Sequence, residues 1–147
     1  MCHYWIKFLV ISIVLLVAKA SSTVPASSWK EPICVFGAER YVRVVNAIQP
    51  AASAQLWLHC ASGNDEKGYH DLSAGQEFKF TYCPLPRSLY FCRLWWAQKT
   101  VAFIVSKTGW RSEYCTHNTC YWEARSDGIY HSADSNPQHG TKVYNWS

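Results

Sequence analysis

The chain has 147 residues, a formal net charge of +4, and 16% charged residues. This length suits a single domain with a substantial buried core. The basic residues are scattered singly along the chain, whereas nucleic-acid-binding domains usually carry clustered lysines and arginines, so nucleic acid is not an expected partner.

The N-terminus has the pattern of a cleavable secretory signal. Lys7 precedes an apolar run from Phe8 to Ala18, and Ala18-Lys19-Ala20 is a small-residue cleavage site. A membrane-spanning helix needs about 20 apolar residues, and neither this run nor any later one is long enough, so no stable membrane insertion is expected. We predict three segments: a signal peptide (1–20), a flexible lead-in (21–33) and a secreted, extracellular domain (34–147).

Cysteine use fits an oxidising compartment. Cys2 would leave with the signal peptide, and six cysteines would remain: Cys34, Cys60, Cys83, Cys92, Cys115 and Cys120. An even number in an exported chain predicts a disulfide framework, although spacing alone does not fix the pairing. The alternative is a zinc site, because Cys115 and Cys120 flank His117, but no second ligand pair lies at close spacing. We expect neither a metal nor another cofactor.

From residue 41 onward the chain has the pattern of a series of short strands. Alternating or β-branched and aromatic runs occupy 41–48, 54–61, 76–83, 88–96, 100–106, 120–125 and 129–131. Between them lie an exposed loop at 62–68 and a proline-containing turn at 83–87. Seven or eight short strands separated by frequent turns predict an all-β fold, either an antiparallel β-sandwich or a barrel.

Three of these runs carry more specific predictions. In 54–61, Leu56, Leu58 and Cys60 share one face, which places Cys60 in the core. The run 100–106 is apolar on both faces, which indicates a central strand. Asp127-Gly128 after the run 120–125 predicts a hairpin with a type I′ turn.

Histidines and tryptophans are the residues that could carry chemistry or binding. His59, His117 and His131 could serve ribonuclease-type acid–base catalysis, but no two of them share a motif with a carboxylate or lysine, so we expect no enzyme. Trp95 and Trp96 must point to opposite faces of their strand, which could expose one of them. Three other tryptophans are expected to pack in the core: Trp57, Trp110 and Trp122.

Five motifs in the same order resemble the plant self-incompatibility S1 family, also called S-protein homologues. The matching residues are Val42-x-Val44-x-Asn46-x-Ile48; Leu58-His59-Cys60-x-Ser62 with an acidic loop ending at Gly68; Phe78-x-Phe80; Tyr90-Phe91-Cys92; and Cys115-x4-Cys120-x-Trp122 leading into Asp127-Gly128-Ile129-Tyr130. The resemblance covers residues 40–131, most of the exported domain.

The resemblance implies a secreted β-sandwich with two disulfides among Cys60, Cys92, Cys115 and Cys120. The best-understood activity of the family is that of a stigma-secreted ligand that triggers rejection of matching pollen, and its motifs imply no enzyme. Cys34 and Cys83 are additional and could form a third bridge. Asp65-Glu66-Lys67-Gly68 replaces the family's Asp-Leu-Gly, which indicates a diverged homologue.

Two functional hypotheses follow. The first is an extracellular ligand for a cell-surface receptor protein in cell–cell recognition, because loops on a rigid scaffold commonly carry binding. Its predicted binding residues lie in two loops: Asn64, Asp65, Glu66 and Lys67 in one, Arg125 and Asp127 in the other. The alternative is a secreted defence protein, such as a small nuclease or a glycan-binding antimicrobial, which the histidines and tryptophans would serve.

Overall fold

Two β-sheets form the part of the chain that the computed structural model describes, residues 33–147. Sheet A has the strand order β4 (Glu77–Tyr82), β1 (Arg40–Asn46), β7 (Thr119–Arg125), β8 (Gly128–Ser132) and β9 (Thr141–Tyr144). Sheet B has the order β3 (Glu66–Leu72), β2 (Leu56–Ala61), β5 (Leu89–Trp96) and β6 (Lys99–Lys107). Short 3-10 turns lie at Ala51–Ser53 and Pro137–His139. The predicted signal peptide and all of the predicted lead-in except Ile33 lie outside the described residues.

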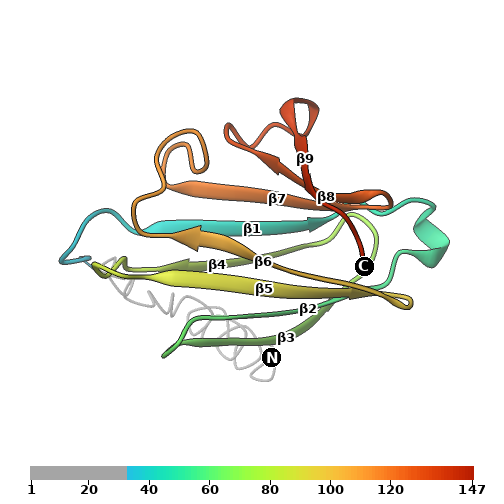
Figure 1. Ribbon diagram of the computed structural model, residues 1–147, viewed down its shortest axis with the longest axis horizontal. Helices are drawn as coiled ribbons and strands as arrows, with labels where there is room; N and C mark the ends of the chain where they lie inside the picture. The colour runs from blue at the N-terminus through green and yellow to red at the C-terminus, as the bar shows by residue number, and fades with distance from the viewer. Residues whose placement is uncertain (1–32) are drawn as a thin grey trace, which may run out of the picture. The chain divides into compact units, whose positions relative to one another are not determined.

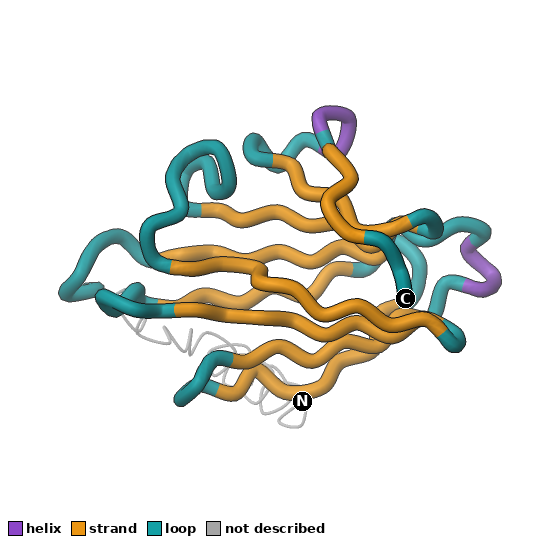
Figure 2. The backbone as a smooth tube through the Cα atoms, in the orientation of Figure 1, coloured by secondary structure: helices purple, strands orange, loops and turns teal. Residues whose placement is uncertain are grey.

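The two sheets face each other across one core, with the loops gathered at the two ends of the strands (Figures 1 and 2). Alternation places Val42 and Val44 of β1, and Leu56 and Leu58 of β2, on the inner faces, where all four are fully buried. Trp122 of β7 spans the two layers, since its indole Nε1 donates a hydrogen bond to the carbonyl of Val105 in β6 at 2.9 Å. The predicted all-β sandwich is confirmed.

The strand count and one pairing differ from the prediction. Residues 33–147 form nine strands, because β3 and β9 are strands that the sequence pattern did not reveal. In β3 only Leu72 is buried, and in β9 no residue is, so neither shows apolar alternation. The sandwich is also not purely antiparallel, since β1 pairs with β7 in parallel.

The prediction that 100–106 forms a central strand is wrong. β6 lies at the edge of sheet B, with β5 as its only strand partner among the described residues. Its inner face carries Val101, Phe103 and Val105, whereas on the outer face Ala102 is exposed. The outer apolar residues therefore have no covering layer, and part of the free edge pairs instead with Ser147, which exchanges two backbone hydrogen bonds of 3.0 Å with Thr100.

The predicted hairpin forms, but its turn is shifted by one residue. Arg125 pairs with Gly128, so the two turn residues are Ser126 and Asp127, neither of which has a positive φ. Gly128 already belongs to β8 and has a φ of +152°. The turn therefore differs from the predicted type I′ turn with Asp127 and Gly128 at its centre.

All six cysteines of the described region form disulfides. Cys60 and Cys92 occupy directly opposed positions of β2 and β5 and are fully buried. Cys115–Cys120 closes the loop that precedes β7, and Cys34–Cys83 ties the segment before β1 to the end of β4. Because Cys115 and Cys120 are bonded to each other, the alternative of a zinc site at this pair is not supported.

Candidate functional site

A cleft of about 830 Å³ opens at one end of the sandwich. Two segments that are distant in sequence form it, the turn between β2 and β3 and the connection from β4 into β5. Its lining consists of Ser62, Gly63, Asn64, Asp65, Tyr82, Cys83, Leu85, Pro86, Arg87, Ser88, Leu89, Tyr90 and Phe91. Of the residues predicted for binding, Asn64 and Asp65 thus line a cleft.

Three charged or polar side chains hold the inner wall of the cleft in place. The Tyr90 hydroxyl donates a hydrogen bond of 2.5 Å to the Asp65 carboxylate, and Lys67 forms an ion pair with the same carboxylate at 2.9 Å. The Lys67 ammonium also donates to the carbonyl of Thr81 in β4 at 3.3 Å, which links an edge strand of sheet B to an edge strand of sheet A. The wall is therefore fixed before any partner binds.

These contacts shift the pKa values of Asp65 and Tyr90 in opposite directions. The hydrogen bond from Tyr90, followed by that from Lys67, lowers the pKa of Asp65 below its ordinary value. Burial, with the hydrogen bond to Asp65 as the next cause, raises the pKa of Tyr90 to about 12. At neutral pH the wall therefore presents a carboxylate that accepts from a neutral phenol.

The outer rim of the cleft is apolar and exposed. Leu85, Leu89 and Phe91 are exposed by 48%, 42% and 38%, and Arg87 lies among them in sequence with an exposed side chain. Exposed apolar side chains grouped around a concave surface are typical of a binding site. None of these residues was predicted for binding, because Leu85 and Arg87 were assigned to a turn and Leu89 and Phe91 to a strand; the available signal was Leu85 between two prolines at a strand end.

The structure corrects the predicted loop at 62–68. Glu66 and Lys67 belong to β3, so only residues 62–65 form the turn. The Glu66 carboxylate accepts from the backbone N–H of Gly68 at 2.9 Å and lies 2.6 Å from His59 Nε2. Glu66 and Lys67 therefore make contacts that stabilise the domain itself.

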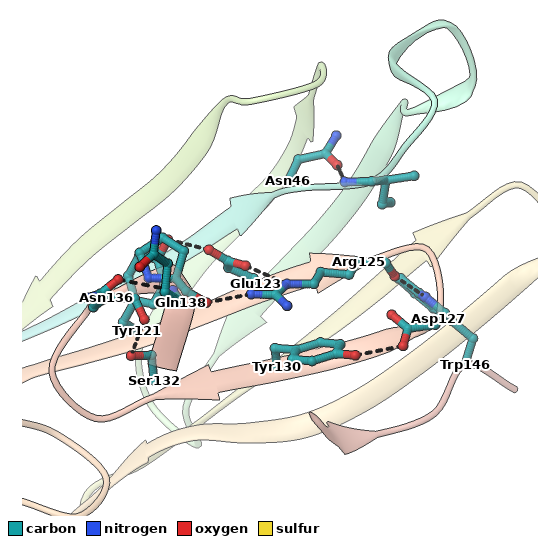
Figure 3. A network of polar contacts seen from close by, with 12 residues as sticks. Asn46, Tyr121, Glu123, Arg125, Asp127, Tyr130, Ser132, Asn136, Gln138 and Trp146 are labelled. Atoms are coloured by element: carbon teal, nitrogen blue, oxygen red, sulfur yellow. Dashed lines mark hydrogen bonds and ion pairs between the residues drawn. The ribbon is translucent and has the colours of Figure 1, made fainter. Parts of the chain in front are cut away.

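The second predicted loop lies at the opposite end of the strands and is used internally (Figure 3). The Arg125 guanidinium donates to the Glu123 carboxylate at 2.7 Å and to the carbonyl of Pro137 at 2.8 Å, and lies 4.0 Å from the centre of the Tyr130 ring. Asp127 accepts a hydrogen bond of 2.7 Å from the Tyr130 hydroxyl. Arg125 and Asp127 are therefore used in contacts within the domain, and neither of them lines the cleft.

The ion pair between Arg125 and Glu123 lies at the buried end of this network. Glu123 is only 4% exposed and accepts from the Tyr121 hydroxyl at 2.7 Å as well as from Arg125. Burial and the bond to Glu123 raise the pKa of Tyr121. Both oxygens of this buried carboxylate are hydrogen-bonded, and the Arg125 guanidinium neutralises its charge, so Glu123 has a structural role.

The three candidate histidines lie on separate elements. His59 is in β2 beside Glu66, His117 is exposed in the connection before β7, and His131 in β8 contacts the ring of Trp122. Within residues 33–147 no hydrogen bond joins any of them to another histidine. The same region holds no group of three metal-ligating side chains.

The tryptophans divide between core and surface. Trp122 is buried, as predicted, and Trp110 is half-buried against the core. Trp57 is 54% exposed, so its prediction as a core residue is wrong. The signal was present, because Trp57 alternates with Leu56 and Leu58 and must therefore face away from them.

No helix among residues 33–147 is long and apolar enough to cross a bilayer.

Comparison with known proteins identifies the family. The family model described as plant self-incompatibility protein S1 matches residues 41–146. S-protein homolog 24 of Arabidopsis thaliana is 32% identical over 146 residues, which covers 97% of this chain and 91% of that protein. S-protein homolog 11 of the same plant is 33% identical over 105 residues, covering 63% of this chain and 67% of that protein. No solved structure matches significantly. The chain therefore belongs to the plant self-incompatibility protein S1 family.

Proposed function

We propose that this protein is an extracellular ligand in plant cell–cell signalling, akin to the pistil determinants of self-incompatibility, and that a cell-surface receptor protein binds in the cleft. Family membership supports a role related to self-incompatibility. Three disulfides in a small domain fit an oxidising, extracellular location. The proposal is of a binding protein and not of an enzyme.

The observation that carries the proposal is the combination of a rigid polar wall and an exposed apolar rim in one cleft. Asp65 and Tyr90 fix the wall, and Leu85 and Leu89 offer apolar surface that a partner would bury. Interfaces of this kind obtain most of their affinity from a few apolar or aromatic anchors surrounded by polar groups. Arg87 adds a charge at the rim, which would steer an acidic partner.

The test is binding of the purified, oxidised protein to plant plasma-membrane vesicles. The variant Leu85→Ser/Arg87→Glu alters two exposed rim residues without touching the Asp65–Tyr90 wall. We expect saturable binding that disappears when the vesicles are treated with protease, and a loss of affinity of about tenfold or more in this variant.

A matched control changes the same kinds of residue elsewhere. Lys99→Glu/Val143→Ser reverses one cation at the start of β6 and removes one exposed apolar side chain from β9. This control should bind like the wild type. Equal binding by the rim variant, or binding that survives protease treatment of the vesicles, would contradict a protein receptor at the cleft.

A further inference from the structure

The outer face of sheet B carries a row of aromatic side chains that the cleft does not use. Trp57, His59, Tyr69 and Trp95 lie on adjacent strands, with Trp57 opposite Trp95 and His59 opposite Tyr69. We call these four residues the aromatic face. Trp57 is 54% and Tyr69 74% exposed, and surface of this kind on a soluble domain usually marks a binding site.

Three of the four rings of the aromatic face, those of His59, Tyr69 and Trp95, contact one another. Tyr69 stacks on His59 at 4.3 Å between ring centres, and Tyr69 and Trp95 are stacked at 6.3 Å with an angle of 26° between their planes. The Arg93 guanidinium lies 5.2 Å from the centre of the Trp95 ring. These contacts restrict the side chains of His59, Tyr69 and Trp95, so this part of the aromatic face would lose little conformational entropy on binding.

Polar groups beside the rings can form hydrogen bonds with the hydroxyl groups of a ligand. The carboxylates of Glu66 and Asp71 flank the aromatic face, Glu66 at 2.6 Å from His59 and Asp71 at 3.1 Å from the Gln55 amide. Among the described residues no hydrogen bond occupies the indole N–H of Trp57 or Trp95. A ligand with many hydroxyls can accept from these N–H groups and donate to the carboxylates.

The charged residues around the aromatic face indicate an uncharged ligand. Two carboxylates, Glu66 and Asp71, and one guanidinium, Arg93, border the aromatic face. A phosphate or uronate polymer needs an excess of cations, which this surface lacks. Pyranose rings present a flat face of C–H groups that stacks on aromatic rings, so a neutral sugar polymer matches both the shape and the charge.

We propose that the aromatic face binds an uncharged polysaccharide chain, with Trp57 and Trp95 stacking on its sugar rings. None of the four residues of the aromatic face lines the cleft, although the His59 ring lies 6.3 Å from the ring of the rim residue Phe91, and the proposal does not depend on the proposed function. Binding would hold the secreted protein on a glycan matrix near the cell surface.

Isothermal titration with soluble xyloglucan, galactomannan and mixed-linkage β-glucan tests the proposal, with polygalacturonate as the anionic probe. We expect binding to at least one neutral polymer and none to polygalacturonate. Trp57→Ala should weaken that binding by about tenfold, as expected for loss of an aromatic anchor, and Trp57→Ala/Trp95→Ala should abolish it.

Two controls separate this site from a general loss of structure and from the cleft. Trp57→Phe keeps a stacking ring and should retain most of the affinity, and Leu85→Ser, in the cleft, should bind glycan like the wild type. Trp57→Ala should in turn keep wild-type binding to membrane vesicles. Absence of binding to all three neutral polymers, unchanged affinity of the double variant, preference for polygalacturonate, or capture of a protein alone by this face would each overturn the proposal.

Discussion

Asn46 shows how one buried polar residue can join the two sheets. It is fully buried at the end of β1, and its amide nitrogen donates to the carbonyls of Ala54 and Leu72, both of which lie at the ends of sheet B strands or next to them. Its amide oxygen accepts from the backbone N–H of Ile48 at 3.1 Å. The side chain thus satisfies three backbone groups that water cannot reach.

Replacing Asn46 with alanine should lower the free energy of unfolding by about 3 kcal/mol, since it leaves those groups without partners. Urea titration of the oxidised protein measures the change. Gln55→Ala is the matched control, because that amide is exposed and makes one side-chain bond to Asp71, so its loss should cost under about 0.5 kcal/mol. A cost for Asn46→Ala no larger than for the control would contradict this role.

Asp134 offers a test of local electrostatics. The contacts of its carboxylate with His139 Nδ1 at 2.5 Å, with the Ser132 hydroxyl and with the Asn136 backbone lower its pKa to about 2. Because the folded pKa lies below the unfolded value of about 3.9, this carboxylate stabilises the fold above that pH, and the contribution is lost as pH falls towards 2.

Carboxyl NMR titration should find the pKa of Asp134 at about 2. His139→Ala removes the largest cause of the lowered pKa and should raise the pKa of Asp134 towards its ordinary value, while that of Asp65 stays unchanged. A wild-type Asp134 that titrates near a pH of about 3.9 would show that the contacts are absent in solution.

The three-stranded unit of β7, β8 and β9 depends on one glycine. Gly128 has a φ of +152°, and a Cβ at this position would collide with the backbone oxygen of Tyr144 in β9. Gly128→Ala should therefore strain the backbone and detach β9, at a cost of about 1–3 kcal/mol. Hydrogen exchange should become faster at the amides of β9 before those of β1.

Gly63→Ala is the control for this experiment, because Gly63 has no positive φ and a Cβ added to it would meet nothing within 4 Å. It should leave both exchange and stability unchanged. Slow exchange in β9 of Gly128→Ala would contradict the steric explanation.

Elements with apolar alternation could be predicted from the sequence, and those without it could not. β4, with Phe80 and Tyr82 facing inward, was readable because one face is buried and the other exposed. β3 was not, because its outward residues are stabilised by contacts such as the stacking of Tyr69 on His59, which involve another strand. The edge position of β6 depends on which strands pair, and pairing is a property of the whole chain.

The candidate site was predicted only in part for the same reason. Asn64 and Asp65 were identified as loop residues, but their neighbours in the cleft lie about 20 residues further along the chain. Only the fold places Tyr90 and Leu85 beside them. Trp57, in contrast, could have been assigned to the surface from strand alternation alone.

The molecule as a whole relies on its disulfides. The chain-entropy contribution of Cys60–Cys92, which are separated by 32 residues, is about 4 kcal/mol, and that of Cys115–Cys120, separated by 5, about 2 kcal/mol. These values are a large part of the stability of a small domain. Reduction of all three bridges should therefore unfold the protein.

The disulfides Cys60–Cys92 and Cys115–Cys120 should contribute differently to the free energy of unfolding. Cys60→Ala/Cys92→Ala should lower the urea midpoint more than Cys115→Ala/Cys120→Ala, because the longer loop restricts the unfolded chain more. For the fully reduced protein, near-ultraviolet circular dichroism in excess reductant reports whether the tertiary structure is lost. A native spectrum under those conditions would show that side-chain packing keeps the protein folded without its disulfides.

We propose that the protein acts outside the cell as a disulfide-linked domain. Intact mass spectrometry of the protein expressed from this sequence in plant tissue is the decisive experiment. We predict a product in the extracellular fluid that begins at Ser21 and takes up iodoacetamide at six cysteines only after reduction. An intracellular product that keeps Met1 and is alkylated without reduction would contradict it.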